Sequence, residues 1–255
     1  MSKVVFKQEN GIATISIDRP EALNALSREI IDDIDRIVTN LNEDESVCCL
    51  IFNSDKNFAA GADIKGMADC NVEEAKKFSF TPTFDKIASL PFPTIAAIEG
   101  YALGGGMELA LACDIRIAGE GAKMGFPETG LGIFPGAGGT IRAPKLIGAG
   151  LAKELIFTGV AISSDRALAI GLVNQVVPDE EVLETAQKMA GKIAKKGPLA
   201  IRSVKNVIDR GLAMNTVNEG TAFEGVEWAK LFDTFDQKEG MKAFMEKRKP
   251  LFQNK

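Results

Sequence analysis

The order of strand-like and helix-like segments is the feature that most limits the fold of this chain. Short apolar runs, such as residues 47–52 and 94–98, alternate with helical patterns up to about residue 178, and only helical patterns follow. Strands separated by helices indicate an α/β architecture. We therefore predict an α/β core over residues 1–196 and a second, helical part over residues 197–255, which begins at a Gly-Pro pair.

Local signals place several elements within this order. Residues 3–18 show apolar alternation around Asn10-Gly11, which predicts a β-hairpin. Ser27 precedes apolar residues at helical spacing and is a suitable N-cap. We also expect one helix over residues 72–90 and another over about residues 105–113. The second of these helices directly follows a glycine-rich turn.

The absence of histidine limits the chemistry that the protein can perform. It excludes Ser-His-Asp and Cys-His nucleophilic catalysis, histidine-ligated zinc and a histidine general base. Proton transfer must then rely on Glu, Asp, Lys, Cys or the single tyrosine, Tyr101. The four cysteines lack the spacing of metal ligands, so we predict no metal site.

Charge and hydropathy indicate the compartment and exclude some partners. A net charge of -5 gives no electrostatic reason to expect binding to nucleic acid or to an anionic membrane. The N-terminus lacks the pattern of a secretory signal, and no apolar stretch is long enough to span a bilayer. Cys48 and Cys49 lie in an apolar run, where free buried thiols are typical. These features predict a cytoplasmic protein.

Glu108 follows the glycine-rich turn Gly104-Gly105-Gly106. Glycines let a ligand approach the backbone closely, and the start of the following helix points free N–H groups and the positive end of its dipole at that ligand. The dinucleotide-binding and P-loop patterns are both absent. An acidic residue in a first helical turn also stabilises the helix dipole, so Glu108 has both a structural and a catalytic interpretation.

Glu128 lies in a second glycine-rich segment, Gly125-Phe-Pro-Glu-Thr-Gly-Leu-Gly132, which continues into Pro135-Gly-Ala-Gly-Gly-Thr140. A carboxylate among apolar neighbours is poorly solvated, which raises its pKa and suits it to proton donation. An ordinary exposed loop glutamate is the alternative. A third segment, Phe58-Ala-Ala-Gly-Ala-Asp-Ile-Lys65, combines small residues with a charged pair, as backbone contact with a ligand requires.

Together and in this order, the three segments resemble the enoyl-CoA hydratase (crotonase) family. The resemblance covers essentially the whole chain, from Ile17-Asp-Arg-Pro-Glu-Ala-Leu-Asn-Ala25, through Ala169-Ile-Gly-Leu-Val-Asn-Gln-Val-Val177, to Phe244-Met-Glu-Lys-Arg-Lys249. It implies a spiral of ββα units followed by a C-terminal helical region that mediates trimerisation. Trimers of this family often pair into hexamers.

The resemblance also implies a reaction, the reversible addition of water to a trans-2-enoyl-CoA. The thioester oxygen would lie between the backbone N–H groups of Ala62 and Gly105. Glu108, as a carboxylate, would deprotonate the water that attacks C3, and Glu128 would give a proton to C2. Coenzyme A is part of the substrate, and no further cofactor is needed. The residues expected to contact substrate or coenzyme A are Ala60, Ala62, Asp63, Ile64, Lys65, Gly136 and Lys249.

Departures from the family pattern leave other functions open. Phe126 stands where many hydratases have glutamine, and Ile133-Phe134 is bulky, so the acyl pocket or the setting of Glu128 is expected to differ. Alternatives are isomerisation of an enoyl-CoA by one glutamate and dehydration of a polar, carnitine-like acyl-CoA. RNA binding, known for one relative, is disfavoured by the acid-rich segment 28–36. A catalytically inactive scaffold is disfavoured because both glutamates are present.

Overall fold

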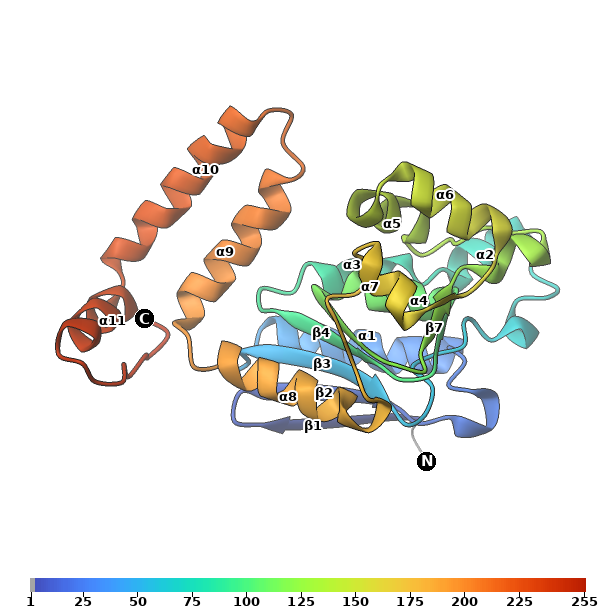
Figure 1. The fold of residues 1–255 in the computed structure, drawn as a ribbon, viewed down its shortest axis with the longest axis horizontal. Helices are drawn as coiled ribbons and strands as arrows, with labels where there is room; N and C mark the ends of the chain where they lie inside the picture. Colours follow the sequence, from blue (N-terminus) through green and yellow to red (C-terminus); the bar gives the residue numbers. More distant parts are fainter. Residues whose placement is uncertain (1–2) are drawn as a thin grey trace.

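Two β-sheets of unequal size form the centre of the protein (Figure 1). The structure is a computed structural model and describes residues 3–255. The larger sheet has the order β1-β2-β3-β4-β6-β9, and the smaller has the order β5-β7-β8. The strands are β1 (Val4–Glu9), β2 (Ile12–Ile17), β3 (Cys49–Ser54), β4 (Thr94–Ile98), β5 (Tyr101–Leu103), β6 (Ile115–Gly119), β7 (Lys123–Gly125), β8 (Ile162–Ser163) and β9 (Gln175–Val177).

The first two strands form the predicted hairpin. They are antiparallel, with Glu9 opposite Ile12. Asn10 and Gly11 both have positive φ, at 52° and 76°. This is the backbone of a two-residue turn whose twist matches that of the strands, and asparagine and glycine adopt it readily. From β2 onward, every neighbouring pair in the larger sheet is parallel.

A repeating unit connects the two sheets. β4 adds to the larger sheet, β5 adds to the smaller one, and α4 (Gly105–Ala112) follows. β6 and β7 repeat this course, because β6 pairs in parallel with β4 and β7 pairs in parallel with β5. A bridge between Ala59 and Ala102 extends the same arrangement to the segment after β3. The repeat places the residue before α4 and the loop after β3 side by side.

The first helices show one confirmed prediction and one error. Helix α1 (Arg28–Asn42) begins at the predicted cap, where the Ser27 hydroxyl accepts from the Ile30 amide at 3.3 Å. The single helix predicted over residues 72–90 is instead two helices, α2 (Val72–Phe78) and α3 (Thr81–Ala88). Pro82 explains the break, since it cannot donate to the carbonyl group of Phe78 but fits the first turn of a new helix.

Four further helices complete the core. They are α5 (Gly139–Ile147), α6 (Ala149–Thr158), α7 (Ser164–Ala169) and α8 (Val182–Ile193). Helix α8 covers one face of the larger sheet, where Val182, Ala186 and Ala190 are buried against apolar side chains of β3, β4 and β6. The other face supports α1, α3 and α4 within the main apolar cluster.

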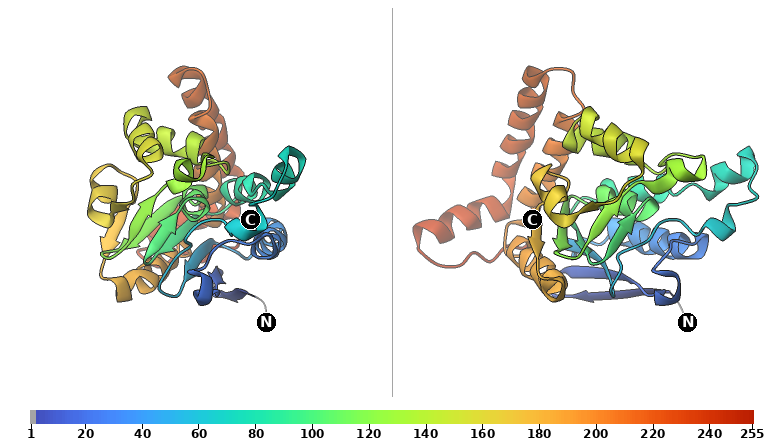
Figure 2. Two further views of the ribbon diagram at one scale, coloured as in Figure 1. Left: turned by 90° about the vertical axis from the view of Figure 1, so that its right-hand side faces the viewer. Right: turned by 45° about the vertical axis from the view of Figure 1, so that its right-hand side comes forward.

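The last helices form an arm that extends from the core (Figures 1 and 2). Helices α9 (Pro198–Gly211) and α10 (Val217–Lys230) lie antiparallel, and α11 (Phe235–Met245) lies at the end of the arm. The predicted boundary between residues 196 and 197 lies in the link between α8 and α9. The buried Lys205 ties α9 to the core through an ion pair with Asp114 at 2.6 Å. No helix within residues 3–255 is long and apolar enough to cross a membrane.

Candidate active site

Helix α4 and the turn before it carry the first predicted glutamate. Every residue of α4 is buried, and Glu108 is only 3% exposed. Gly104 has φ 50° and ψ -122°, a conformation that favours glycine. Its carbonyl oxygen accepts from the Glu108 amide, and its own amide donates to Gly125. The turn therefore joins the start of α4 to the loop that contains Glu128.

Two backbone amides hold the Glu108 carboxyl group. Oε1 accepts from the amides of Ala137 and Gly139 at 2.7 and 2.8 Å. Burial raises the pKa of Glu108 above its usual value, while these two amides and the charge of Arg142 oppose the rise. Amide donors stabilise the ionised form of a carboxyl group. The contacts therefore favour Glu108 as a carboxylate that is already oriented.

Glu128 has a different environment, although it is the same kind of residue. It lies on the short helix η3 (Pro127–Leu131), and its Oε2 is buried with no hydrogen-bond partner within residues 3–255. Burial is the main cause that raises the pKa of Glu128, to about 7, and the nearby charge of Glu108 adds to it. This side chain can therefore carry a proton near neutral pH and has an oxygen free to share with a ligand or water.

The two glutamates meet across Gly104. A Cβ atom at Gly104 would lie 2.7 Å from Oε1 of Glu128, so any other residue would displace that carboxyl group. The same glycine accepts from the amide of Glu108. The charge of the Glu108 carboxyl group also raises the pKa of Glu128, so the structure brings together the two carboxyl groups that the sequence singled out.

The two predicted oxyanion donors also lie together. Ala62 is held by backbone bonds on either side of it, from Leu26 to the carbonyl oxygen of Gly61 and from Asp63 to that of Leu26, both at 2.8 Å. A Cβ at Gly105 would lie 3.5 Å from the amide nitrogen of Ala62. In the described part of the chain, neither the Ala62 amide nor the Gly105 amide donates a hydrogen bond. Both amides remain available to one oxygen atom.

The other predicted contact residues divide into supporting and exposed positions. Ala60 donates its amide to Leu23, and Asp63 forms an ion pair with Arg19 at 2.8 Å. These two residues support the loop that presents Ala62. The exposed positions are Ile64, Lys65, Gly136 and Lys249.

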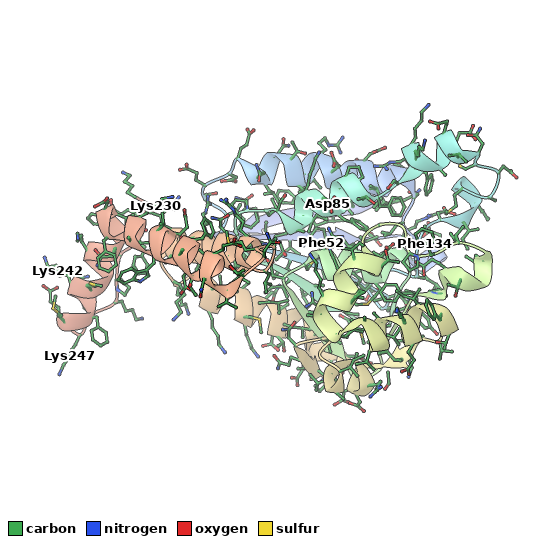
Figure 3. All side chains as sticks on the ribbon, turned by 90° about the horizontal axis from the view of Figure 1, so that it is seen from above. Phe52, Asp85, Phe134, Lys230, Lys242 and Lys247 are labelled. Carbon is green, nitrogen blue, oxygen red and sulfur yellow. The ribbon has the colours of Figure 1, made fainter. Side chains whose placement is uncertain are left out.

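Lys249 belongs to the segment after α11, far from the glutamates. Figure 3 labels Lys247 at one end of the molecule and Phe134, in the loop after Glu128, toward the other. Within one chain, the C-terminal basic residues therefore do not reach the loops that carry the catalytic candidates.

Sequence reasoning missed the residues that orient Glu108. The amides of Ala137 and Gly139 lie in the glycine-rich segment 135–140, but nothing in the sequence indicates that they donate to Glu108. Phe126, expected to alter the acyl pocket or the setting of Glu128, is fully buried. A Cβ at Gly139 would lie 2.9 Å from its ring, so Phe126 packs beneath the turn that binds Glu108.

Comparison with known proteins assigns the family. The family model described as enoyl-CoA hydratase/isomerase matches residues 7–255. The chain belongs to the enoyl-CoA hydratase/isomerase family. It is 43% identical over 253 residues to the short-chain-enoyl-CoA hydratase of Clostridium acetobutylicum, covering 98% of this chain and 97% of that protein. It is 44% identical over 256 residues to the crotonyl-CoA hydratase of Syntrophomonas wolfei, covering 99% of this chain and 98% of that one.

Solved structures confirm the fold expected for an enoyl-CoA hydratase/isomerase. An enoyl-CoA hydratase crystal structure from Bacillus anthracis is 40% identical and has a TM-score of 0.96, covering 99% of this chain and 100% of that one. The α/β spiral and the C-terminal helices are therefore those of the crotonase fold. The prediction of fold and family from the sequence is correct.

Proposed function

We propose that this protein is an enoyl-CoA hydratase, which adds water reversibly to a trans-2-enoyl-CoA and dehydrates the 3-hydroxyacyl-CoA in the reverse direction. The observation that carries the proposal is the contrast between the two glutamates. Glu108 accepts two amide hydrogen bonds that favour its carboxylate form, whereas Glu128 has a raised pKa and an oxygen without a partner. Addition of water needs one base and one acid, and this pair supplies both.

The two free backbone amides, of Ala62 and Gly105, would activate the thioester. As water attacks C3, negative charge develops on the thioester oxygen, and the Ala62 and Gly105 amides would donate to it. Gly105 is the first residue of α4, so the helix dipole adds to this stabilisation. One such donor typically lowers the barrier by about 3 kcal/mol. The step needs no metal, nicotinamide or flavin, because the thioester itself stabilises the enolate.

The proton transfers follow from the placement of the two side chains. Glu108 takes a proton from water while the oxygen bonds to C3, and Glu128 gives its proton to C2. The product leaves Glu108 protonated and Glu128 ionised, and exchange with solvent restores both. Because the two groups interact, their titration belongs to the pair rather than to either residue.

The remaining parts of the proposal concern partners and location. The acyl-CoA substrate is the expected ligand, and the net charge of -5 disfavours nucleic acid. Four free cysteines support a reducing compartment such as the cytoplasm. Exposed apolar side chains on the arm support a homo-oligomer, a trimer or a hexamer, in which Lys249 of one chain approaches the coenzyme A bound to another. The exposed apolar residues of the arm include Leu212, Val217, Trp228, Phe244 and Met245.

Product analysis tests the reaction against isomerisation. Isomerisation needs only one carboxyl group, and the raised pKa of Glu128 would suit it. The protein is offered crotonyl-CoA and, separately, the 3-enoyl isomer. We expect crotonyl-CoA to lose its conjugated absorbance and yield 3-hydroxybutyryl-CoA. Conversion of the 3-enoyl isomer alone, with crotonyl-CoA left unchanged, would contradict hydration and indicate an isomerase.

A further inference from the structure

The turn that holds Glu108 accepts a hydrogen bond from the side chain of Arg142. Arg142 lies in the first turn of α5, and its Nη1 donates to the carbonyl oxygen of Ala137 at 3.1 Å. Its Nη2 donates to Oδ1 of Asp85 on α3 at 2.5 Å. Ala137 therefore accepts from Arg142 through its carbonyl oxygen and donates to Glu108 through its amide.

The turn is shaped around this guanidinium group. Gly138 has a φ of 108°, and a Cβ there would overlap Nη1 of Arg142. The Arg142 side chain is 20% exposed, and its guanidinium contacts the same turn whose amides donate to Glu108. Helix α3 adds a second contact, because the Thr81 hydroxyl donates to the carbonyl oxygen of Gly136 at 3.0 Å.

We propose that Arg142 is a positioning residue, which keeps the Ala137–Gly139 turn in the geometry that holds Glu108 as a carboxylate, with Asp85 fixing the guanidinium. This proposal rests on the proposed role of Glu108 as the base. Arg142 acts through the turn and touches neither substrate nor the reacting atoms.

The charge of Arg142, like its contact with the turn, favours the carboxylate form of Glu108. The charged groups that influence the Glu108 carboxyl are Glu128 from η3 and Arg142 from α5. The positive charge of Arg142 lowers the pKa of Glu108 and opposes the rise caused by burial. Removing Arg142 therefore raises this pKa. A base is active when ionised, so the acid side of the pH–rate profile should move to higher pH.

The first experiment compares pH profiles of kcat/KM for hydration of crotonyl-CoA. We expect Arg142→Leu to move the acid limb upward by about one pH unit, and Asp85→Asn to move it less. Arg142→Lys keeps the charge and should restore most of the wild-type position. Lys86→Met is the matched control, since Lys86 is also on α3 but pairs with Asp35 at 2.7 Å. It should leave the limb in place.

The contrary result is a fall in rate at every pH with an unmoved acid limb. That outcome would give Arg142 a purely structural role and overturn the proposal. If Arg142→Leu does not fold, Asp85→Asn decides the question, because a fall in rate with an unmoved acid limb in that variant would also overturn the proposal.

A second measurement separates this proposal from the proposed function. The infrared band of protonated Glu108 is identified by difference from Glu108→Gln, and its pH midpoint is compared between wild type and Arg142→Leu. We expect a higher midpoint in Arg142→Leu, whether or not the protein hydrates crotonyl-CoA. An inactive wild type would contradict the hydratase, whereas an unchanged midpoint would contradict the role of Arg142.

Discussion

Glu108 and Glu128 differ in what surrounds them, and this difference supports the roles proposed for them. Burial raises the pKa of both carboxyl groups. Glu108 accepts from two amides of another segment, which favour its charged form, whereas the Glu128 carboxyl group is helped by its own backbone amide and its Oε2 has no partner within residues 3–255. Two carboxyl groups whose environments separate their proton affinities can serve as base and acid at one pH.

The raised pKa of Glu128 predicts a pH-dependent stability. Its folded value of about 7 lies above the usual carboxyl value, so ionisation is less favourable in the folded chain. The stability that comes from holding Glu128 neutral is fully present below the pKa of an unfolded glutamate. It is lost as the pH rises through the folded pKa. We expect Glu128→Gln to melt slightly above wild type at about pH 5 and clearly above it at about pH 8.

Thermal unfolding followed by circular dichroism across this range measures the difference. Glu9→Gln, on the exposed strand β1, removes one negative charge elsewhere and is the control. A Glu128→Gln difference that stays constant with pH would show that burial does not raise this pKa in the folded protein.

At the scale of elements, α4 approaches the loop after β3 only because Gly106 has no side chain. A Cβ at Gly106 would collide with the carbonyl group of Ala59. We therefore expect Gly106→Ala to lower the free energy of unfolding by about 2 kcal/mol, although alanine favours a helix. Gly191, in α8, faces open space, and Gly191→Ala should raise the free energy of unfolding by about 0.5–1 kcal/mol.

Urea denaturation of the two variants measures both changes. Stabilisation by both substitutions would mean that α4 does not approach Ala59 as closely as described.

Elements with strong local signals could be predicted from the sequence. The Asn10-Gly11 turn and the Ser27 cap each depend on a few adjacent residues, and both predictions are confirmed. Strands β5, β7 and β8 contain only two or three residues, which is too short for an alternating pattern. Their pairing depends on the course of the whole spiral, so local patterns did not reveal them.

The candidate site also combines residues that the sequence revealed with contacts that it did not. Glu108, Glu128, Ala62 and Gly105 were found because their segments resemble a family, and the structure places them beside one another. The amides that orient Glu108 belong to a turn about thirty residues later, and any residue type can supply an amide. The sequence of the turn therefore contains no sign of this contact.

At the scale of the whole molecule, the arm formed by α9, α10 and α11 exposes several large apolar side chains. Phe244 on α11 is 84% exposed, and Leu212, Val217 and Trp228 are exposed on the same arm. Such surfaces typically mark an interface. We expect sedimentation to give three or six times the chain mass of 27.3 kDa, and Phe244→Asp to weaken the assembly.

Phe157→Asp is the matched control, because Phe157 is also exposed but lies on α6, outside the arm. It should leave at least the trimer intact. A wild-type protein that sediments as a single chain would contradict the assembly.

The rates of the two glutamate variants test the central claim most directly. Initial rates of crotonyl-CoA hydration are measured for wild type, Glu108→Gln and Glu128→Gln. If each carboxyl group transfers a proton as proposed, each variant should lose a factor of about 10²–10⁴ in rate. The double variant should lose little more, since the two groups act together. A Glu108→Gln protein that hydrates at the wild-type rate would contradict the account, because one carboxyl group would then suffice.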